Sequence, residues 1–333
     1  MNDELELLNR FKSIVLRKGR AGLEEARKEI LSSKYIKGPV LSATKYFARV
    51  TLRDGLPVFP ALVSLSCEAV GGKTEKTTSI AAALVLIAGA ADIHDDIIDK
   101  SARKYSKKTI FGKFGGDVAL LAGDALLILG STFLFRECEK LPKEQRNAIL
   151  GLMPEALFEI SNAEAMETGL MKNLETTPQE YLKIIRLKSV VPELHCKIGA
   201  ILGNGKKRDV EILGNYGRTF GIVSLIREEF IDLIEYQELV GRLQNECAPL
   251  PILYALQNPK IRKEISSTIE NEKLNEDNMF KMVDAVLETK EVQELKSIMN
   301  SLIEREIMQL KYVKSNILRN ELSLILRAVG AET

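Results

Sequence analysis

Leu, Ile and Ala recur at spacings of three and four residues through most of this chain, over 3–18, 76–100, 116–138, 178–204, 209–236 and 276–329. This spacing lines apolar side chains along one face of an α-helix. No stretch alternates apolar and polar residues with enrichment in Val, Ile and Thr, so no sheet is expected. The pattern predicts an all-α fold.

Glycine and proline separate the predicted helices at short intervals, for example at Gly38-Pro39, Gly115-Gly116 and Pro249/Pro251. No long Ser/Gly/Pro linker, internal repeat or low-complexity segment divides the 333 residues. We therefore predict one helical domain over residues 1–333, with ten or more helices.

Charge and composition exclude several functional classes. Lys plus Arg (47) nearly balances Asp plus Glu (46), and there is no Trp, so a nucleic-acid partner is not expected. Four widely spaced cysteines form no zinc or disulfide pattern, which indicates a reducing compartment. The charged start lacks a signal-peptide core, and no apolar run reaches the length of a membrane span. We expect a soluble, cytoplasmic protein with no transmembrane segment.

The segment 79–100 is apolar nearly all round and ends in the sequence DIHDDIIDK. Thr77, Thr78 or Ser79 could cap this helix. A helix that is apolar on every side is normally buried within a bundle. The sequence thus predicts a central helix with a group of aspartates at its C-terminal end.

Asp92, Asp95, Asp96 and Asp99 share one face of that helix, because residues three and four apart are neighbours. Carboxylates repel each other, and the C-terminal end of a helix disfavours negative charge. A bound cation offsets both penalties, and hard oxygen ligands suit Mg²⁺. The alternative is a solvated, charged helix end beside Lys100, Arg103 and Lys104.

A second carboxylate cluster lies in the apolar segment 217–233. Glu228, Glu229 and Asp232 have the same i, i+1, i+4 spacing. Two such clusters facing each other on buried helices would make a metal-bridged diphosphate site. The sequence REEFID alone is also a common surface pattern.

Several motifs in one order carry a resemblance to a known family. They are DDIID (95–99), FGGDVALLAGDALL (114–127), YLKIIRLKS (181–189), YGRTFGIVSLIREEFID (216–232) and PLPILYAL (249–256). In order and separation, from about residue 40 to 257, the chain resembles the trans-prenyl diphosphate synthases. The resemblance implies the class I isoprenoid synthase fold, a helical bundle around a central cavity.

The resemblance also implies an allylic diphosphate bound through three Mg²⁺ ions. The metal ligands would be Asp95, Asp96, Asp99, Glu228, Glu229 and Asp232. Lys188, Arg103, Lys104 and Arg242 would contact diphosphate oxygens, with Lys188 as a catalytic side chain. Metal and cations would stabilise the departing diphosphate, and apolar walls would protect the allylic cation from water.

The chain departs from the family where a second substrate, isopentenyl diphosphate, is held by four cationic groups. Leu56, Phe59, Ala88 and Tyr105 occupy those positions. Placing several negative charges against apolar side chains is costly. We therefore expect no second diphosphate there, and a pocket suited to a neutral or aromatic acceptor.

Other positions carry further expectations. Ala90 and Ala91, upstream of DDIID, would leave an open floor for a long prenyl tail, or would simply allow close helix packing. Pro192 should kink the helix after Lys188, beside the cation or as a packing feature. His94 is expected to be structural, and His195 is expected in the core or at its rim.

The sequence predicts a prenyltransferase, which transfers alkyl groups other than methyl, acting on an acceptor other than isopentenyl diphosphate. Three alternatives stay open: a chain-elongating prenyl diphosphate synthase with rearranged contacts, a terpene cyclase, and a non-catalytic subunit of a heteromeric synthase. The intact DDIID favours catalysis. The resemblance further implies a homodimer, or a heterodimer with a homologous chain.

Overall fold

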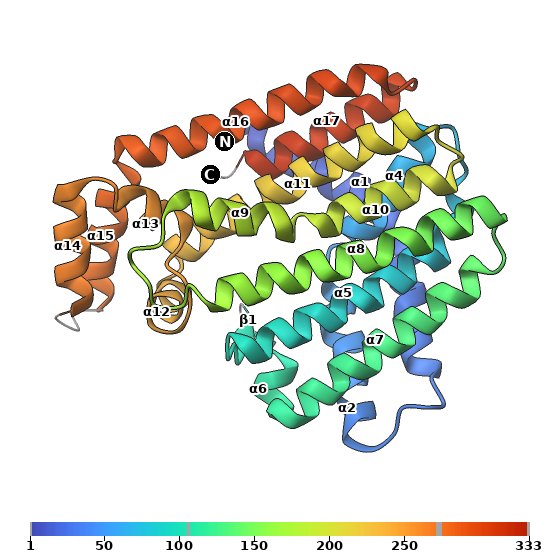
Figure 1. Cartoon of the computed structure of the whole chain (residues 1–333), viewed down its shortest axis with the longest axis horizontal. Helices are drawn as coiled ribbons and strands as arrows, with labels where there is room; N and C mark the ends of the chain where they lie inside the picture. The colour runs from blue at the N-terminus through green and yellow to red at the C-terminus, as the bar shows by residue number, and fades with distance from the viewer. Residues whose placement is uncertain (1, 105–106, 271–274, 332–333) are drawn as a thin grey trace. The chain divides into compact units, whose positions relative to one another are not determined.

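The structure is a computed structural model that describes residues 2–104, 107–270 and 275–331. Helices make up nearly all of this described part, which contains more than ten α-helices and confirms the predicted all-α class (Figure 1). The exception is a pair of two-residue strands, which the sequence did not predict. Strands this short carry no alternation that a sequence pattern could reveal.

Backbone contacts divide the chain into two compact units that are interleaved in sequence. The first unit comprises Met1–Leu157, Val191–Gly217 and Leu310–Leu324, and the second comprises Phe158–Val190, Arg218–Gln309 and Ile325–Thr333. The single domain over residues 1–333 stays a prediction.

The first unit begins with a series of helices and ends its first segment with the start of α8. In chain order it contains α1 (Asn2–Ser32), α2 (Gly38–Tyr46), the π-helix η1 (Phe47–Thr51), α3 (Leu52–Asp54), α4 (Val58–Ala69), the 3-10 turn η2 (Thr74–Lys76), α5 (Thr78–Ile98), β1 (Arg103–Lys104), β2 (Lys107–Lys108), α6 (Ile110–Phe114), α7 (Gly116–Cys138) and part of α8 (Lys143–Thr168). Nearly all of α10 (Val190–Leu202), the start of α11 (Lys207–Ile234), η3 (Leu310–Tyr312) and most of α17 (Asn316–Gly330) complete it.

Helix α5 forms much of the core of this unit, as its apolar sequence predicted. Its residues from Ile80 to Leu86 are at most 8% exposed. It packs along α7, which lies beside it (Figure 1), and a Cβ at Gly130 would lie 2.9 Å from Leu86 Cβ. Thr77 precedes the helix as predicted, but its hydroxyl donates to the Thr74 carbonyl (2.7 Å) and caps nothing.

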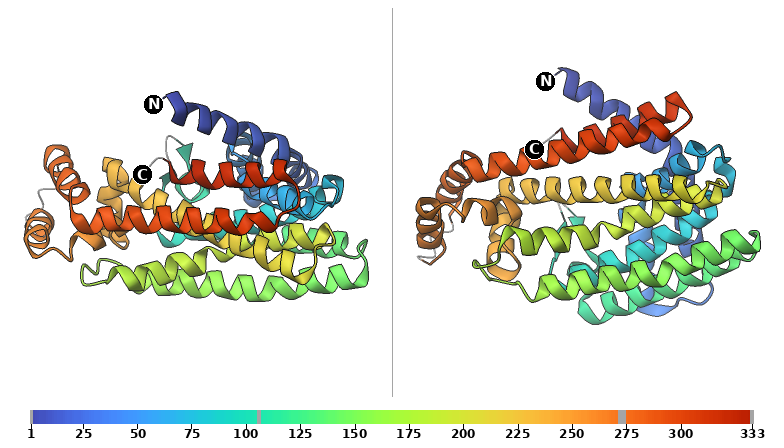
Figure 2. Two further views of the ribbon diagram at one scale, coloured as in Figure 1. Left: turned by 90° about the horizontal axis from the view of Figure 1, so that it is seen from above. Right: turned by 45° about the horizontal axis from the view of Figure 1, so that its top comes forward.

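The second unit holds the remaining elements. These are the end of α8, α9 (Pro178–Lys188), most of α11, α12 (Tyr236–Asn245), α13 (Leu250–Ala255), α14 (Pro259–Glu270), α15 (Glu276–Leu287), α16 (Lys290–Gln309) and the end of α17. Helices α14 and α15 lie side by side, and α13 packs on α9, α15 and α16 (Figure 2).

The predicted helix over 178–204 is interrupted. Helix α9 ends at Lys188, and α10 begins at Val190. Pro192 has no N–H with which to bond the carbonyl of residue 188, so the helix cannot continue unbroken through this point. Ser189 lies between the two helices, and its hydroxyl donates a hydrogen bond to the Ile185 carbonyl (2.7 Å).

Helix α7 alone among the described helices is long and apolar enough to cross a membrane, by length and composition only. About 39% of its most apolar stretch is buried, and one face packs on α5. Core helices of ordinary folded proteins meet the same criterion, so this is weak evidence for a span.

Candidate functional site

The predicted aspartate cluster lies at the C-terminal end of α5, in the first unit. Asp99 is the C-cap residue, and its N–H donates to the Asp95 carbonyl (2.9 Å). Asp92 is exposed, Asp95 is partly exposed, and Asp96 points inward with only 4% exposure. The expected one-sided stripe is therefore present, but its members differ widely in their access to solvent.

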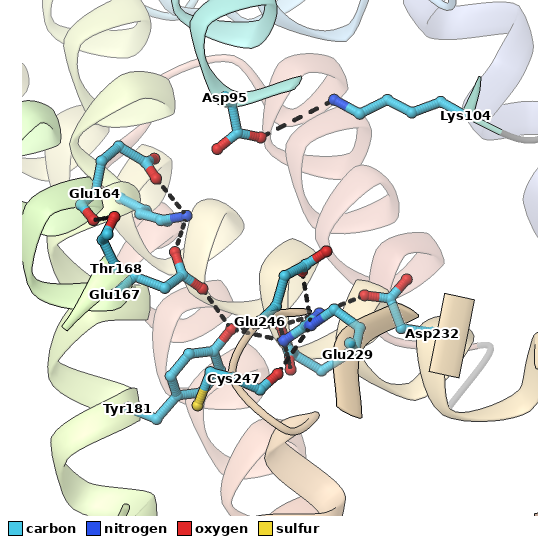
Figure 3. Close-up of polar contacts among 12 residues, drawn as sticks. Asp95, Lys104, Glu164, Glu167, Thr168, Tyr181, Glu229, Asp232, Glu246 and Cys247 are labelled. Atoms are coloured by element: carbon cyan, nitrogen blue, oxygen red, sulfur yellow. Dashed lines mark hydrogen bonds and ion pairs between the residues drawn. The ribbon is translucent and has the colours of Figure 1, made fainter. Parts of the chain in front are cut away.

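Lys104, on strand β1, places its ammonium group among these carboxylates. Its Nζ lies 2.7 Å from Asp92 Oδ1, 3.0 Å from Asp96 Oδ1 and 4.0 Å from Asp95 Oδ2, the last of which is drawn in Figure 3. Burial alone would lower the pKa of Lys104, but Asp92 and Asp96 outweigh it and raise that pKa. The cluster thus already attracts a cation.

The pKa of Asp96 in this cluster is strongly perturbed. Burial raises the pKa of its carboxyl to about 7, although the nearby Lys104 charge opposes the shift. Among the aspartates of DDIID, the buried Asp96 is thus the least suited to an exposed ligand role, and Asp95 and Asp99 remain the outer pair.

The β1–β2 hairpin brings further cations to this end of the unit. Arg103 is exposed and pairs in register with Lys108. Lys107 Nζ lies 2.8 Å from Asp54 Oδ2, and that hydrogen bond is the main reason that the pKa of Asp54 falls to about 2. Tyr105, expected in the acceptor pocket, lies outside the described residues.

The other positions of the expected acceptor pocket also belong to the first unit. Leu56 is 39% exposed, while Phe59 and Ala88 are partly buried. The ring of Phe59 packs against the imidazole of His195 at 5.1 Å between centroids.

Burial lowers the pKa of His195 to about 4, so the imidazole ring is uncharged at neutral pH. Its 2% exposure confirms that His195 is a core residue.

The two alanines expected at the tail-pocket floor have different surroundings. Ala90 is 1% exposed, whereas Ala91 is exposed. The open floor stays a prediction. His94, expected to be structural, places its Nε2 3.3 Å from Asp124 Oδ1 of α7.

The second carboxylate cluster lies near the end of α11, in the second unit. Glu229 is 7% exposed, and Glu228 and Asp232 are partly exposed. Burial raises the pKa of Glu228, and it raises the pKa of Asp232 to about 6 against the opposing charge of Arg242. These groups are desolvated, and one cation dominates their surroundings.

That cation is Arg242, in the last turn of α12. Its guanidinium lies 3.1 Å from Glu229, 2.5 Å from Asp232 and 3.1 Å from Glu246. It also donates to the Tyr181 hydroxyl (2.9 Å) and the Cys247 carbonyl (3.0 Å). Figure 3 shows these labelled partners converging. Arg242, which the sequence predicts to contact diphosphate, is bound on several sides within its own unit.

Lys188 is likewise held by carboxylates. It forms ion pairs with Glu164, at 3.0 Å, and with Glu167 (Figure 3). Burial would raise the pKa of Glu167, but Lys188 outweighs it and lowers that pKa. The Tyr181 hydroxyl oxygen lies 2.7 Å from Glu167 and 3.0 Å from Glu229 and can donate its single proton to either carboxylate, which connects the surroundings of Lys188 with those of Arg242.

Sequence reasoning missed Glu164, Glu167 and Tyr181. Both glutamates lie in the last turns of α8, a helix whose weak apolar periodicity and internal Pro154 concealed it. Tyr181 directly follows the capping box of Thr177 and Glu180, which fixes the start of α9. No spacing in the sequence indicates that these side chains meet.

The two clusters differ in their fit to a divalent metal. Within the described ranges, no three His, Cys, Asp or Glu side chains form a preformed metal site. Mg²⁺ commonly uses one or two carboxylates plus water and substrate phosphates. The outer pair Asp95 and Asp99 fits that mode. Glu229 does not fit it, because Arg242, the Tyr181 hydroxyl and the Leu250 N–H engage both of its oxygens, and Arg242 also holds Oδ2 of Asp232.

Comparisons with known proteins agree on one family. The family model described as polyprenyl synthetase matches residues 44–286. A short chain isoprenyl diphosphate synthase of Methanothermobacter thermautotrophicus is 29% identical over 189 residues, 56% of this chain and 57% of that relative. The match thus spans little more than half of that relative. Heptaprenyl diphosphate synthase component 2 of Bacillus subtilis is 22% identical over 83% of this chain and 78% of its own length.

Solved structures share the fold. Geranylgeranyl pyrophosphate synthetase from Pyrococcus horikoshii aligns over 97% of this chain and 98% of its own, at a TM-score of 0.80 and 21% identity. A polyprenyl synthase from Caulobacter crescentus, complexed with calcium and isoprenyl diphosphate, aligns over 98% of both chains. Its TM-score is 0.82 and its sequence identity is 18%. The described helices and the family match lead to one conclusion: the chain belongs to the polyprenyl synthetase family, with its all-α class I isoprenoid synthase fold.

Proposed function

We propose that this protein is a Mg²⁺-dependent prenyltransferase that binds an allylic prenyl diphosphate at the end of α5 and ionises it. The observation that carries the proposal is the aspartate cluster with Lys104 among its carboxylates. Asp95 and Asp99 would hold Mg²⁺, with Asp96 behind them. The metal, when bound, would neutralise charge on the departing diphosphate.

Side chains of the chain itself would do the rest. Lys104 and Arg103, both on the hairpin after the cluster, would bind diphosphate oxygens through charge-assisted hydrogen bonds. The apolar wall of α5 would keep water away from the allylic cation. The proposed ion count is three, as the family resemblance implies.

The acceptor in this proposal is not isopentenyl diphosphate. Phe59 packs on an uncharged imidazole, and Leu56 and Ala88 offer no charge, so the former second-diphosphate positions present an apolar surface. A neutral or aromatic acceptor fits such a surface. Chain elongation and terpene cyclisation remain the alternatives within catalysis.

The decisive experiment incubates purified protein with Mg²⁺ and long-chain allylic diphosphates, with and without isopentenyl diphosphate. We expect diphosphate release that EDTA abolishes, and no elongated product. The double variant Asp95→Asn, Asp99→Asn should lower kcat by roughly 10²–10³-fold, the scale for lost electrostatic stabilisation. Asp284→Asn, an exposed aspartate of α15, is the matched control. Elongated product would refute the apolar-acceptor proposal.

A non-catalytic subunit is the second candidate, and the face of α7 favours it. Leu121, Ile128 and Phe135 recur every seven residues and are 53%, 67% and 57% exposed. Exposed apolar stripes of this kind mark protein interfaces. We propose a second copy or a homologous prenyl synthase as the occupant, in keeping with the relative named component 2 of a synthase. No turnover alone, but turnover with a co-purified homologous chain, would favour this candidate.

The proposed location is the cytoplasm. All four cysteines are buried as free thiols. Free thiols are typical of a reducing compartment.

A further inference from the structure

We propose that Arg242 takes the place of a divalent cation at the second carboxylate cluster, so that Glu229 and Asp232 bind no metal and the metal of this protein is held at the end of α5. The inference rests on the proposed function and adds which of the two carboxylate clusters holds the metal. Four observations in the second unit and one in the first support it.

Arg242 is built into the unit rather than resting on its surface. Its side chain is 9% exposed, and its donors reach Glu229, Asp232, Glu246, Tyr181 and the Cys247 carbonyl. A planar guanidinium matches carboxylates in a fixed fork and keeps its charge in all conditions. Removing its partners would leave an unpaired charge in the interior, which is strongly unfavourable.

Glu229 has no oxygen left for a metal. Its Oε1 faces Arg242 Nη1 and Nη2 (both 3.3 Å) and the Tyr181 hydroxyl (3.0 Å). Its Oε2 accepts from Arg242 Nη2 (3.1 Å) and from the Leu250 backbone N–H (2.8 Å). Each oxygen thus already has at least two donors, so a metal could bind only after these bonds broke.

Asp232 is engaged by the same group. Its Oδ2 lies 2.5 Å from Arg242 Nη1, the shortest of the Arg242 contacts. Glu228, whose side chain is 47% exposed, is 3.6 Å from Arg227 and touches no part of this network that the structure describes. A guanidinium this close to Asp232 places a fixed positive charge where a metal bound to that carboxylate would lie, and like charges repel.

Lys104 contrasts with Arg242. Its side chain is 43% exposed, and its ammonium sits on a flexible four-carbon stem at a short hairpin. Its ion pair with Asp92, whose side chain is 46% exposed, contributes little stability, while its ion pair with Asp96 reaches a buried carboxylate. A metal and a diphosphate can therefore displace Lys104 from its aspartates, whereas Arg242 stays in place.

Bound Mn²⁺, measured by electron paramagnetic resonance on the full chain with inorganic pyrophosphate present, tests the inference without a turnover assay. We expect Asp95→Asn with Asp99→Asn to weaken binding at least tenfold. Asp232→Asn and Glu228→Gln, each tested separately, should leave affinity and stoichiometry within twofold of the unmodified protein. Asp284→Asn is the control for loss of one carboxylate.

Loss of bound manganese in Asp232→Asn or Glu228→Gln would overturn the inference while leaving the proposed function intact. A crystal soaked with Mn²⁺ and pyrophosphate provides an independent measurement. An anomalous peak beside Asp95 and none beside Asp232 is expected, and a peak at Asp232 with Arg242 displaced would refute the claim. Failure of the unmodified protein to bind Mn²⁺ would refute both the inference and the proposed function.

Discussion

At the residue scale, the buried position of His195 opposes protonation of its imidazole. Its Nδ1 lies 2.7 Å from the Val191 carbonyl oxygen, so this nitrogen carries the proton and donates it. Its Nε2 is buried with no partner among the described residues. Protonation would place a second N–H, and a charge, in an apolar environment beside Phe59.

We therefore expect His195 to make stability depend on pH. Its pKa is about 4 in the folded protein against an ordinary 6.5, so the unfolded chain binds the proton more readily. Its contribution is complete above pH 6.5 and is lost as pH falls toward 4, by about 3 kcal/mol at most.

Urea unfolding at several pH values measures this effect. The difference in unfolding free energy between the unmodified protein and His195→Gln should shrink as pH falls from 7 to 4.5. The comparison cancels the titration of every other group. A difference that stays constant over this range would contradict the prediction.

The sequence predicted which residues would cluster locally but not how they would be paired. Asp95, Asp96 and Asp99 meet because a helix repeats every 3.6 residues, so spacing suffices. Arg242 reaches Glu229 only because a short turn at Glu235 brings α12 back toward α11. That reversal depends on backbone dihedrals and packing, which the spacing of charged residues does not encode.

At the element scale, α4 and α10 cross at very close range in the first unit. A Cβ on Gly199 would overlap the Val63 carbonyl oxygen and lie 2.9 Å from Ser66 Cβ. Backbone atoms cannot move aside as a flexible side chain can, so the helices would have to separate.

Gly199→Ala should therefore destabilise the fold by about 1–3 kcal/mol, the usual cost of overpacking. The control is Gly151→Ala on α8, where a Cβ meets nothing within 4 Å. That change should stabilise by about 0.5–1 kcal/mol, because alanine favours a helix over glycine. Thermal unfolding measures both, and equal shifts in the two variants would contradict the close crossing.

Long apolar helices were the elements most readily predicted from sequence. Helices α5 and α7 fall within a residue or two of the expected ranges, because both are long, continuous apolar segments bounded by polar residues or glycine. Helix α8 was missed because its apolar residues show little helical periodicity and Pro154 lies inside it. The expected helix over 276–329 is divided into α15, α16, η3 and α17, since Thr289 and the residues around Ser315 terminate helices without glycine or proline.

At the scale of the whole molecule, the exposed face of α7 predicts an oligomer. Ile128→Glu would place a charge at the centre of the Leu121, Ile128 and Phe135 stripe. If a second chain covers this stripe, the variant should sediment as a monomer and the unmodified protein as a dimer. Ile317→Glu is the control, since Ile317 of α17 is also an exposed isoleucine (72%). A monomeric unmodified protein, or equal dissociation by both variants, would contradict this prediction.

The interleaving of the two units has a consequence for synthesis on the ribosome. Helix α17 contributes residues to both units, and in the first unit the buried Tyr216 hydroxyl bonds the Leu322 carbonyl (2.9 Å). Neither unit can close until translation has passed that point. The apolar side chains that these late residues cover stay exposed until then, so we expect chaperones to bind ribosome-held chains that end before α17.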